Sequence, residues 1–336
     1  MELDHAAVEK EVCKEMTEEI IVSMLKILVF PGALFLFALA FFYEWVDRKF
    51  FARVQNRYGP LHTGLHGILQ PIADFFKLLS KEDITPHSSD KLMFFLTPIF
   101  YFALPLTTLF VIPILGQTSV IAFEGDLIFV IFAFTLIIIT VFLAGWSSMN
   151  RFGTIGSMRA VLQMLSYEIP MGLVTTGPAI AASSLSISEI VKWQSPPNFW
   201  LILLQPLGFA VFTICLLAEL QLVPFDIPEA ETEIVAGWRT EFTGRKLALL
   251  RLGRDLELVL ASALITSLYL GGSQQFWLIP PIVIFLVKTT FAVMLLSLLR
   301  AVFARFRIDQ MLSGMWKYLL PLAALQIILI QLGLGG

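Results

Sequence analysis

Residues 127–146 read LIFVIFAFTLIIITVFLAGW, twenty consecutive residues without a charge. An apolar stretch of about 20 residues is long enough to cross a bilayer as an α-helix. The whole chain has the same character, because 57% of its 336 residues are apolar and only 15% are Asp, Glu, Lys or Arg. Soluble domains carry about 25% charged residues. The composition excludes a disordered chain, a coiled coil and a disulfide scaffold, and it indicates an all-α polytopic membrane protein.

Further apolar windows lie on both sides of this stretch. Residues 1–19 are acidic and lack the basic start and small-residue cleavage site of a secretory signal. We therefore expect a short N-terminal extension, 1–19, before a membrane domain, 20–334. The windows predict eight transmembrane helices, at 20–43, 92–115, 127–146, 160–182, 200–219, 247–272, 279–299 and 318–334.

Lys and Arg are distributed unevenly among the connections between these windows. Sixteen of them lie in connections 44–91, 147–159, 220–246 and 300–317, whereas the other connections contain only Lys192. Basic residues favour the cytoplasmic side of a membrane. We therefore expect the four basic connections to face the cytoplasm and both termini to lie outside.

Several ionisable residues fall inside the expected spans. At the membrane centre such a residue costs roughly 2.5–3.5 kcal/mol, so it faces protein or water and is a candidate for function. A long side chain near a span end reaches the interface instead, an alternative open for Lys26 and Arg251. Glu168, with Tyr167 beside it, fits either a proton relay or a hydrogen bond between helices. The residues concerned are Lys26, Glu168, Arg251, Arg254, Asp255, Glu257 and Lys288.

The first connection contains a predicted amphipathic helix. Pro71 fits the first turn of a helix, and apolar residues recur after it at helical spacing, which predicts a helix lying in the membrane interface. The apolar positions are Ile72, Phe75, Phe76 and Leu79. A basic stretch precedes the helix and fits either chain orientation and anionic lipid or a dock for a cytoplasmic partner. Its members are Arg48, Lys49, Arg53 and Arg57.

The fifth connection is rich in carboxylates with apolar residues between them. We expect Asp226 to cap a helix with Pro228 in its first turn, so that Asp226, Glu229 and Glu233 share one face. Crowded carboxylates beside apolar surface cannot all ionise independently, so we expect some of their pKa values to rise toward neutral, and such groups can hold or pass protons. The alternative is a solvated acidic loop. The six acids are Glu219, Asp226, Glu229, Glu231, Glu233 and Glu241, with Arg239 as the one base among them.

Several functional signatures are missing from the sequence. It has no phosphate-binding loop, no dinucleotide fingerprint and no zinc-protease motif. Cys13 and Cys215 are too far apart for a paired-cysteine motif, and the net charge is only −3. We therefore expect no catalytic residue, metal or cofactor in this chain and no nucleic-acid partner.

Longer motifs in the basic connections resemble a known family. They are DRKFFARVQNRYGP with LQPIADFFKLLSKE at 47–82, GW at 145–146, MRAVLQMLSYEIPMG at 158–172, PFDIPEAETEIVAG at 224–237 with EFTG at 241–244, and RIDQMLSGMWKYLLPL at 307–322. With these motifs the chain resembles the H subunit of respiratory complex I and its relatives in membrane-bound hydrogenases and ferredoxin-dependent respiratory complexes. The motifs follow one another through all four basic connections.

The resemblance implies a membrane subunit that anchors a hydrophilic electron-transfer arm. A carboxylate-lined path would link redox events to ion movement. Carried onto this chain, the path residues are Glu168, Glu219, Asp226, Glu229, Glu231, Glu233 and Glu241. Arg254 and Asp255 of the sixth span complete our set of proton or ion pathway candidates. The arm-contact residues would be Arg48, Arg53, Arg57, Gln70, Asp74 and Lys77.

The resemblance also implies partners and a location. The partners would be hydrophilic iron–sulfur (Fe-S) subunits, large catalytic-type subunits, antiporter-like and small membrane subunits, and membrane lipid. Fe-S clusters, and nickel–iron (Ni-Fe) in a hydrogenase-like complex, would lie in those partner subunits. The location would be the plasma membrane of a prokaryote. The chain would be non-catalytic alone and would act within an ion-translocating oxidoreductase complex.

Two departures from the family pattern bear on the electron acceptor. Quinone-reducing members usually carry Arg before the PFD stretch, where this chain has Leu222. They also tend to carry Glu and an aromatic residue where this chain has Arg254 and Asp255. These departures favour a hydrogenase-like or related ferredoxin-dependent complex. The alternatives are the quinone-site subunit of an NADH– or reduced deazaflavin–quinone oxidoreductase and, in another class, a stand-alone ion carrier.

Overall fold

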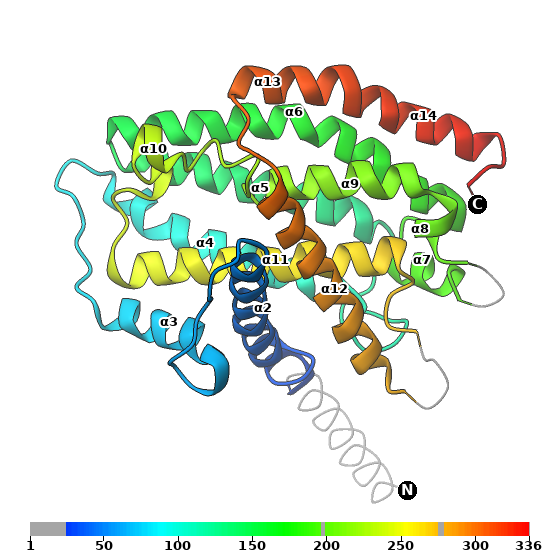
Figure 1. The fold of residues 1–336 in the computed structure, drawn as a ribbon, viewed down its shortest axis with the longest axis horizontal. Helices are drawn as coiled ribbons and strands as arrows, with labels where there is room; N and C mark the ends of the chain where they lie inside the picture. The colour runs from blue at the N-terminus through cyan, green and yellow to red at the C-terminus, as the bar shows by residue number, and fades with distance from the viewer. Residues whose placement is uncertain (1–24, 196–198, 275–278, 336) are drawn as a thin grey trace, which may run out of the picture.

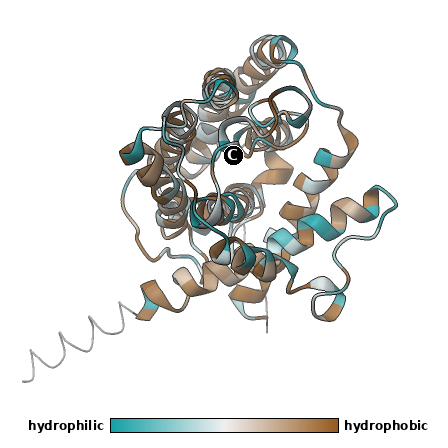
Figure 2. Ribbon diagram, turned by 90° about the vertical axis from the view of Figure 1, so that its left-hand side faces the viewer, coloured by the Kyte–Doolittle hydropathy of each residue, from teal (hydrophilic) through white to brown (hydrophobic). Residues whose placement is uncertain are grey.

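The computed structural model describes residues 25–195, 199–274 and 279–335. Every secondary-structure element in these ranges is helical, so the predicted all-α class is confirmed. Figure 1 shows the long helices packed into one bundle, and Figure 2 shows that hydrophobic residues dominate them. The expected extension 1–19 lies outside the described residues.

Each of the eight apolar windows overlaps a helix of the described residues. Among the described residues, five stretches are long and apolar enough to cross a membrane, namely Leu25–Val54, Lys91–Leu109, Asp126–Ser147, Pro281–Val302 and Ile308–Gln331. The helices at the eight windows are α2 (Ala33–Val54), α4 (Lys91–Leu109), α5 (Asp126–Ser147), α6 (Arg151–Ala182), α9 (Pro206–Glu219), α11 (Gly244–Tyr269), α12 (Pro281–Val302) and α14 (Leu320–Gln331).

The remaining three expected spans correspond to α6, α9 and α11. Helix α9 has only 14 residues, and α11 carries several charges in its first half. A total of eight spans, and the outward orientation of both termini, therefore stay predictions.

Shorter helical segments connect the long ones. They are η1 (Leu65–Gly67), α3 (Gln70–Ser80), α7 (Ile187–Trp193), α8 (Leu201–Leu204), α10 (Glu231–Ile234), η2 (Gly237–Arg239), α13 (Ile308–Gly314) and the π-helical η3 (Met315–Leu319).

Helix α3 is the amphipathic helix predicted in the first connection. Pro71 stands in its first turn, where the missing N–H of proline is no loss because that group has no helical partner. Phe75 packs against Phe41 of α2 with ring centroids 5.6 Å apart, and Leu78 is buried. Lys77 on another face is exposed.

Helix α11 is the central helix of the bundle. It packs against α2, α3, α4 and α12, and Figure 1 shows it crossing the middle of the molecule. Nearly every residue from Leu256 to Tyr269 is buried, as expected for a helix that is apolar on all sides.

Two contacts position α11, one at Gly253 in its first half and one at its C-terminal end. At Gly253 the backbone lies so close to α4 that an added Cβ would come within 2.7 Å of the Tyr101 ring. At the C-terminal end Lys288 of α12 donates to the Leu270 carbonyl at 2.6 Å and to the Gly272 carbonyl at 2.9 Å. A cation at this position also opposes the negative end of the helix dipole.

The close approach at Gly253 makes a test of the packing. Gly253→Ala places a methyl group against Tyr101, and overpacking of this kind costs about 1–3 kcal/mol. We expect the midpoint of thermal denaturation of the detergent-solubilised protein to fall by several degrees. The matched control is Gly172→Ala in α6, where an added Cβ meets nothing within 4 Å. Equal midpoints for the two variants would contradict the packing of α11 on α4.

Candidate functional site

A polar cavity of about 660 Å³ lies where α2, α11 and α12 meet the 220–240 segment. Eleven of its twenty lining residues are ionisable, an unusual density for the interior of an apolar bundle. Within the described ranges no three His, Cys, Asp or Glu side chains are placed to hold a metal ion together. The ionisable lining residues are Glu44, Asp47, Arg48, Asp226, Glu229, Glu231, Arg239, Arg251, Arg254, Asp255 and Arg300.

Glu229 is at the centre of the charges in this cavity. Its carboxylate pairs with the Arg239 guanidinium and accepts a hydrogen bond from Arg254 Nη1 at 3.0 Å. Arg239 also lies over the Trp238 ring, 5.4 Å from its centroid. A buried carboxylate is tolerated only when its charge is paired and hydrogen-bonded. The two arginines supply that compensation, from η2 on one side and from α11 on the other.

The helix expected to begin at Asp226 is absent, so that prediction is wrong. Residues 226–230 are irregular, with a turn at Pro228 and Glu229, and α10 begins only at Glu231, with Ala230 at its N-cap and no side-chain cap. Local capping preference is worth about 1 kcal/mol. Pairing the buried Glu229 is worth more than this, and the turn at 228–229 directs the Glu229 side chain inward to Arg239 and Arg254.

The acids of this segment lie in different surroundings, and their pKa values differ accordingly. Burial raises the pKa of Asp226 to about 6, and the neighbouring Glu229 adds to the rise, against the influence of nearby arginines. Glu233 is exposed and pairs with Arg159 of α6 at 2.6 Å, which lowers its pKa. A raised pKa, predicted for some of these acids, is thus found at Asp226, whereas the pKa of Glu233 is lowered.

Four of the expected pathway acids lie outside the cavity lining. Glu168 of α6 accepts a hydrogen bond from Thr135 of α5 at 2.5 Å, and Glu219 accepts one from Tyr167. Glu233 pairs with Arg159, as described above. Glu241 accepts a hydrogen bond from Asn150, the N-cap residue of α6. The cavity itself contains the other five candidates, Asp226, Glu229, Glu231, Arg254 and Asp255.

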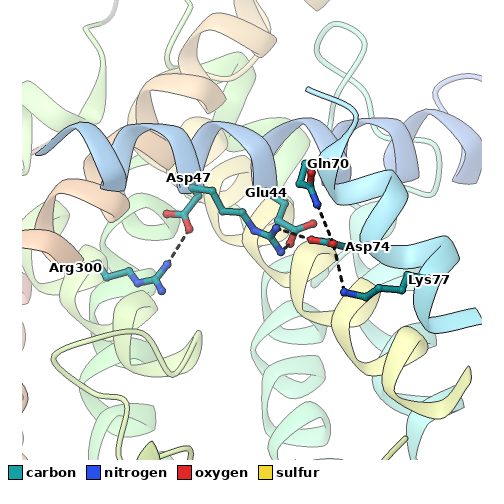
Figure 3. A network of polar contacts seen from close by, with 7 residues as sticks. Glu44, Asp47, Gln70, Asp74, Lys77 and Arg300 are labelled. Carbon is teal, nitrogen blue, oxygen red and sulfur yellow. Dashed lines mark hydrogen bonds and ion pairs between the residues drawn. The ribbon is translucent and has the colours of Figure 1, made fainter. Parts of the chain in front are cut away.

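Four of the six expected arm-contact residues form one network on α2 and α3 (Figure 3). Asp74 accepts hydrogen bonds from Arg48 at 2.9 Å and from Gln70 at 3.1 Å, and Lys77 lies 3.7 Å away. Burial alone would raise the pKa of Asp74, but the hydrogen bonds from Arg48 and Gln70 outweigh it and hold the pKa below its usual value.

The remaining two arm-contact candidates stand apart from that network. Arg53 lies over the Tyr58 ring and Arg57 over the Phe51 ring, with centroid distances of 5.3 and 5.4 Å. The guanidinium group of Arg300 on α12 also lies over the Phe51 ring, 4.6 Å from its centroid. Arg300 donates to Asp47 at 2.8 Å and so joins α12 to α2, as Figure 3 shows.

The sequence analysis did not assign several residues that the structure places at the site. Glu44, Asp47, Arg239 and Arg300 line the cavity, and Glu257 is buried one turn beyond Arg254. For Glu44 the sequence does contain a signal, because Glu44 and Arg48 are four residues apart on one helix, a spacing that favours an ion pair. Glu257 was recognised as an intramembrane charge without a role.

The fold and this site define an integral membrane protein whose helices surround a charged interior. The family model described as NADH dehydrogenase matches residues 25–331. The chain therefore belongs to this family, whose similar members are named as the H subunit of NADH-quinone oxidoreductase.

Bacterial relatives resemble the chain over most of its length. The H subunit from Dehalococcoides mccartyi is 40% identical over 285 residues, which are 85% of this chain and 80% of the relative. An H subunit from Rhizobium meliloti, numbered 2 in its name, is 38% identical over 85% of this chain and 89% of its own. The H subunit from Carboxydothermus hydrogenoformans is 37% identical over 92% and 89%. The family-model match, residues 25–331, spans every helix that contributes to the cavity.

The raised pKa of Asp226 gives a pH-dependent prediction. An aspartate titrates near 4 when unfolded and near 6 here, so the folded chain binds more protons between these values. The free energy of unfolding therefore falls as pH rises from about 4 to about 6. We expect Asp226→Asn to show a smaller fall than the wild type over this window, measured as the thermal midpoint at each pH. Parallel pH curves for the two proteins would contradict burial of Asp226.

Proposed function

We propose that this chain is the membrane subunit of an energy-converting redox complex of the complex I type. It anchors a hydrophilic electron-transfer arm and couples the redox chemistry of that arm to proton or sodium translocation. The observation that carries the proposal is the charged cavity, because groups arranged around Glu229 respond to any charge that changes nearby.

The lining of the cavity suits the holding and transfer of charge better than the binding of an uncharged quinone ring. Small-molecule pockets are lined mostly by apolar side chains with few polar groups, whereas more than half of this lining is ionisable. Leu222 also lines the cavity, at the position where quinone-reducing members usually carry Arg. Arg254, the second departure from that pattern, pairs with Glu229. These features support a hydrogenase-like or ferredoxin-dependent complex whose electrons end in the arm.

The arm-contact surface of this proposal is α3 with the end of α2. Lys77 is 70% exposed at its side chain, and Phe76 is 62% exposed. An exposed apolar and basic face beside the bilayer suits a dock for the hydrophilic Fe-S and large catalytic-type subunits. Antiporter-like and small membrane subunits would cover other faces of the bundle.

The proposal includes a topology and a location. Eight spans with both termini outside place connections 44–91, 147–159, 220–246 and 300–317 at the cytoplasmic surface of a prokaryotic plasma membrane. Their basic residues support this orientation. Fe-S clusters, and Ni-Fe in a hydrogenase-like complex, belong to the partner subunits.

Glu168→Gln and Glu229→Gln test the coupling. Each change keeps the shape of the side chain but removes the titrating group. We expect ion pumping to be abolished in membrane vesicles while electron transfer from soluble donors stays measurable. The readouts are a pH-sensitive dye for the gradient and donor oxidation for electron flow.

Glu189→Gln is the matched control, because Glu189 is exposed and pairs with Lys192 at 2.7 Å in the short helix α7. It should pump as the wild type does. Wild-type pumping in both pathway variants would defeat the proposal.

A quinone-site subunit is the second candidate, favoured by the names of the bacterial relatives. Under that candidate, oxidation of the donor should accelerate when a short-chain quinone is added to the purified complex. A photoreactive quinone analogue should then label residues of the cavity. No acceleration and no labelling are expected from the leading proposal.

A further inference from the structure

A smaller cavity, of about 510 Å³, lies where the start of α4 meets the start of α11. It differs from the charged cavity around Glu229 because its lining contains no carboxylate. Apart from one aromatic ring, every side chain in this lining carries a hydrogen-bond donor. The lining residues are Thr85, His87, Lys91, Phe95 and Lys246.

Lys246 of α11 forms the buried wall of this cavity. Its side chain is only 10% exposed, and its ammonium group donates to Asp83 Oδ1 at 2.9 Å and to Thr85 Oγ1 at 2.8 Å. The same group lies over the Phe94 ring, 5.2 Å from its centroid. An ammonium group has three N–H donors, and because two are used in this way, one remains for a bound anion. The Thr85 hydroxyl accepts from Lys246 and keeps its own proton to donate.

The segment that precedes α4 is held against the start of α11 by close backbone contacts. The Ile84 N–H donates to Thr243 Oγ1 at 3.0 Å. An added Cβ at Gly244 would come within 2.7 Å of the Glu82 carbonyl oxygen, so the two backbones touch here. The donors on this segment are therefore in position before a ligand arrives, and preorganisation of this kind lowers the entropic cost of binding.

The outer side of the cavity has donors that are still free. Among the described residues, the side chains of Lys91 and His87 form no hydrogen bond or ion pair, and both residues are exposed. The two nearest carboxylates are already engaged, because Asp83 pairs with Lys246 and Asp90 caps the first turn of α4. The cavity therefore presents positive charge and hydrogen-bond donors, which is the chemistry that binds an anion.

An apolar, exposed face of α4 adjoins this cavity. Lys91 is the first residue of Lys91–Leu109, one of the stretches able to cross a membrane, so the cavity lies at the end of that span. Phe95, one helical turn into the span, lines the cavity and is 58% exposed. Leu92 and Ile99 lie one turn before and one turn after Phe95, on the same face, and both are exposed.

We propose that this cavity binds the headgroup of an anionic phospholipid. Its phosphodiester oxygens accept hydrogen bonds from Lys91, Lys246 and Thr85, and one of its acyl chains lies along Phe95 and Ile99. A free phosphate would use the basic cavity and leave the apolar face uncovered. A zwitterionic headgroup carries a cation as well, for which the lining offers no carboxylate. Basic residues beside a membrane span favour anionic lipid for the same electrostatic reason.

Photochemical cross-linking tests the proposal on the protein extracted from its membrane with the chains that co-purify. The probe is phosphatidylglycerol with a diazirine in its acyl chain, and the readout is labelling of the peptide that contains Phe95, measured by mass spectrometry. We expect excess unlabelled phosphatidylglycerol to abolish this labelling. Phosphatidylcholine with the same acyl chains should compete at least fivefold less well, because its headgroup has no net charge. Inorganic phosphate should not compete.

Lys91→Gln is the main variant, because it removes a charge without breaking a side-chain contact within the described part of the chain. We expect labelling to fall about fivefold. Lys91→Arg retains the charge and should retain the labelling. The matched control is Lys317→Gln, since Lys317 is an exposed lysine of another candidate span, Ile308–Gln331. It should leave the labelling unchanged.

Equal competition by phosphatidylcholine and phosphatidylglycerol would overturn the proposal, because the labelling would then report ordinary contact with the bilayer. Unchanged labelling in Lys91→Gln, or no labelling of the Phe95 peptide in the wild type, would overturn it as well. Competition by inorganic phosphate as strong as that by phosphatidylglycerol would make this a site for a free anion and overturn the lipid assignment. None of these readouts involves electron transfer or pumping, so a failure here is distinguishable from a failure of the proposed function.

Discussion

The whole arrangement depends on the need to neutralise charge where water is scarce. Glu229 is placed between Arg239 and Arg254, and an unpaired carboxylate at that depth would cost several kcal/mol. This requirement decides the shape of the 220–240 segment, which turns inward at Glu229 instead of continuing as a helix. It also links Arg254 of α11 to Arg239 of η2 through one shared carboxylate in the cavity lining.

The same requirement organises the neighbouring helices. The end of α2 carries three ion pairs, which are Arg48 with Glu44, Arg48 with Asp74, and Asp47 with Arg300. Through these contacts α3 and α12 are attached to α2 by charge as well as by packing. The cavity is therefore enclosed by helices whose relative positions are set by ion pairs, and a change in one charge reaches several of them.

The sequence predicted those features that depend on local periodicity. The apolar windows correspond to helices, and Pro71 begins α3 as its position indicates. The family motifs singled out Asp226 and Glu229, and both line the cavity. Local patterns failed where distant partners decide the outcome, since the capping preference of Asp226 is smaller than the cost of leaving Glu229 unpaired. Arg300 pairs with a residue 253 positions away, and no spacing rule reveals such a contact.

Lys288 gives α11 an asymmetry between its two ends. Its ammonium group donates hydrogen bonds to the carbonyls of Leu270 and Gly272 at the negative end of the helix dipole, and so holds the C-terminal end of α11 in place. The residues from Leu256 to Tyr269 are tightly packed, which leaves no room for that half of the helix to move. A shift of α11 along its axis would break the hydrogen bonds of the Lys288 ammonium group and leave that charge without acceptors in an apolar environment. The C-terminal half of α11 is therefore fixed in position. A change of charge near Arg254 is accommodated by an exchange of side-chain partners, without a shift of the helix backbone.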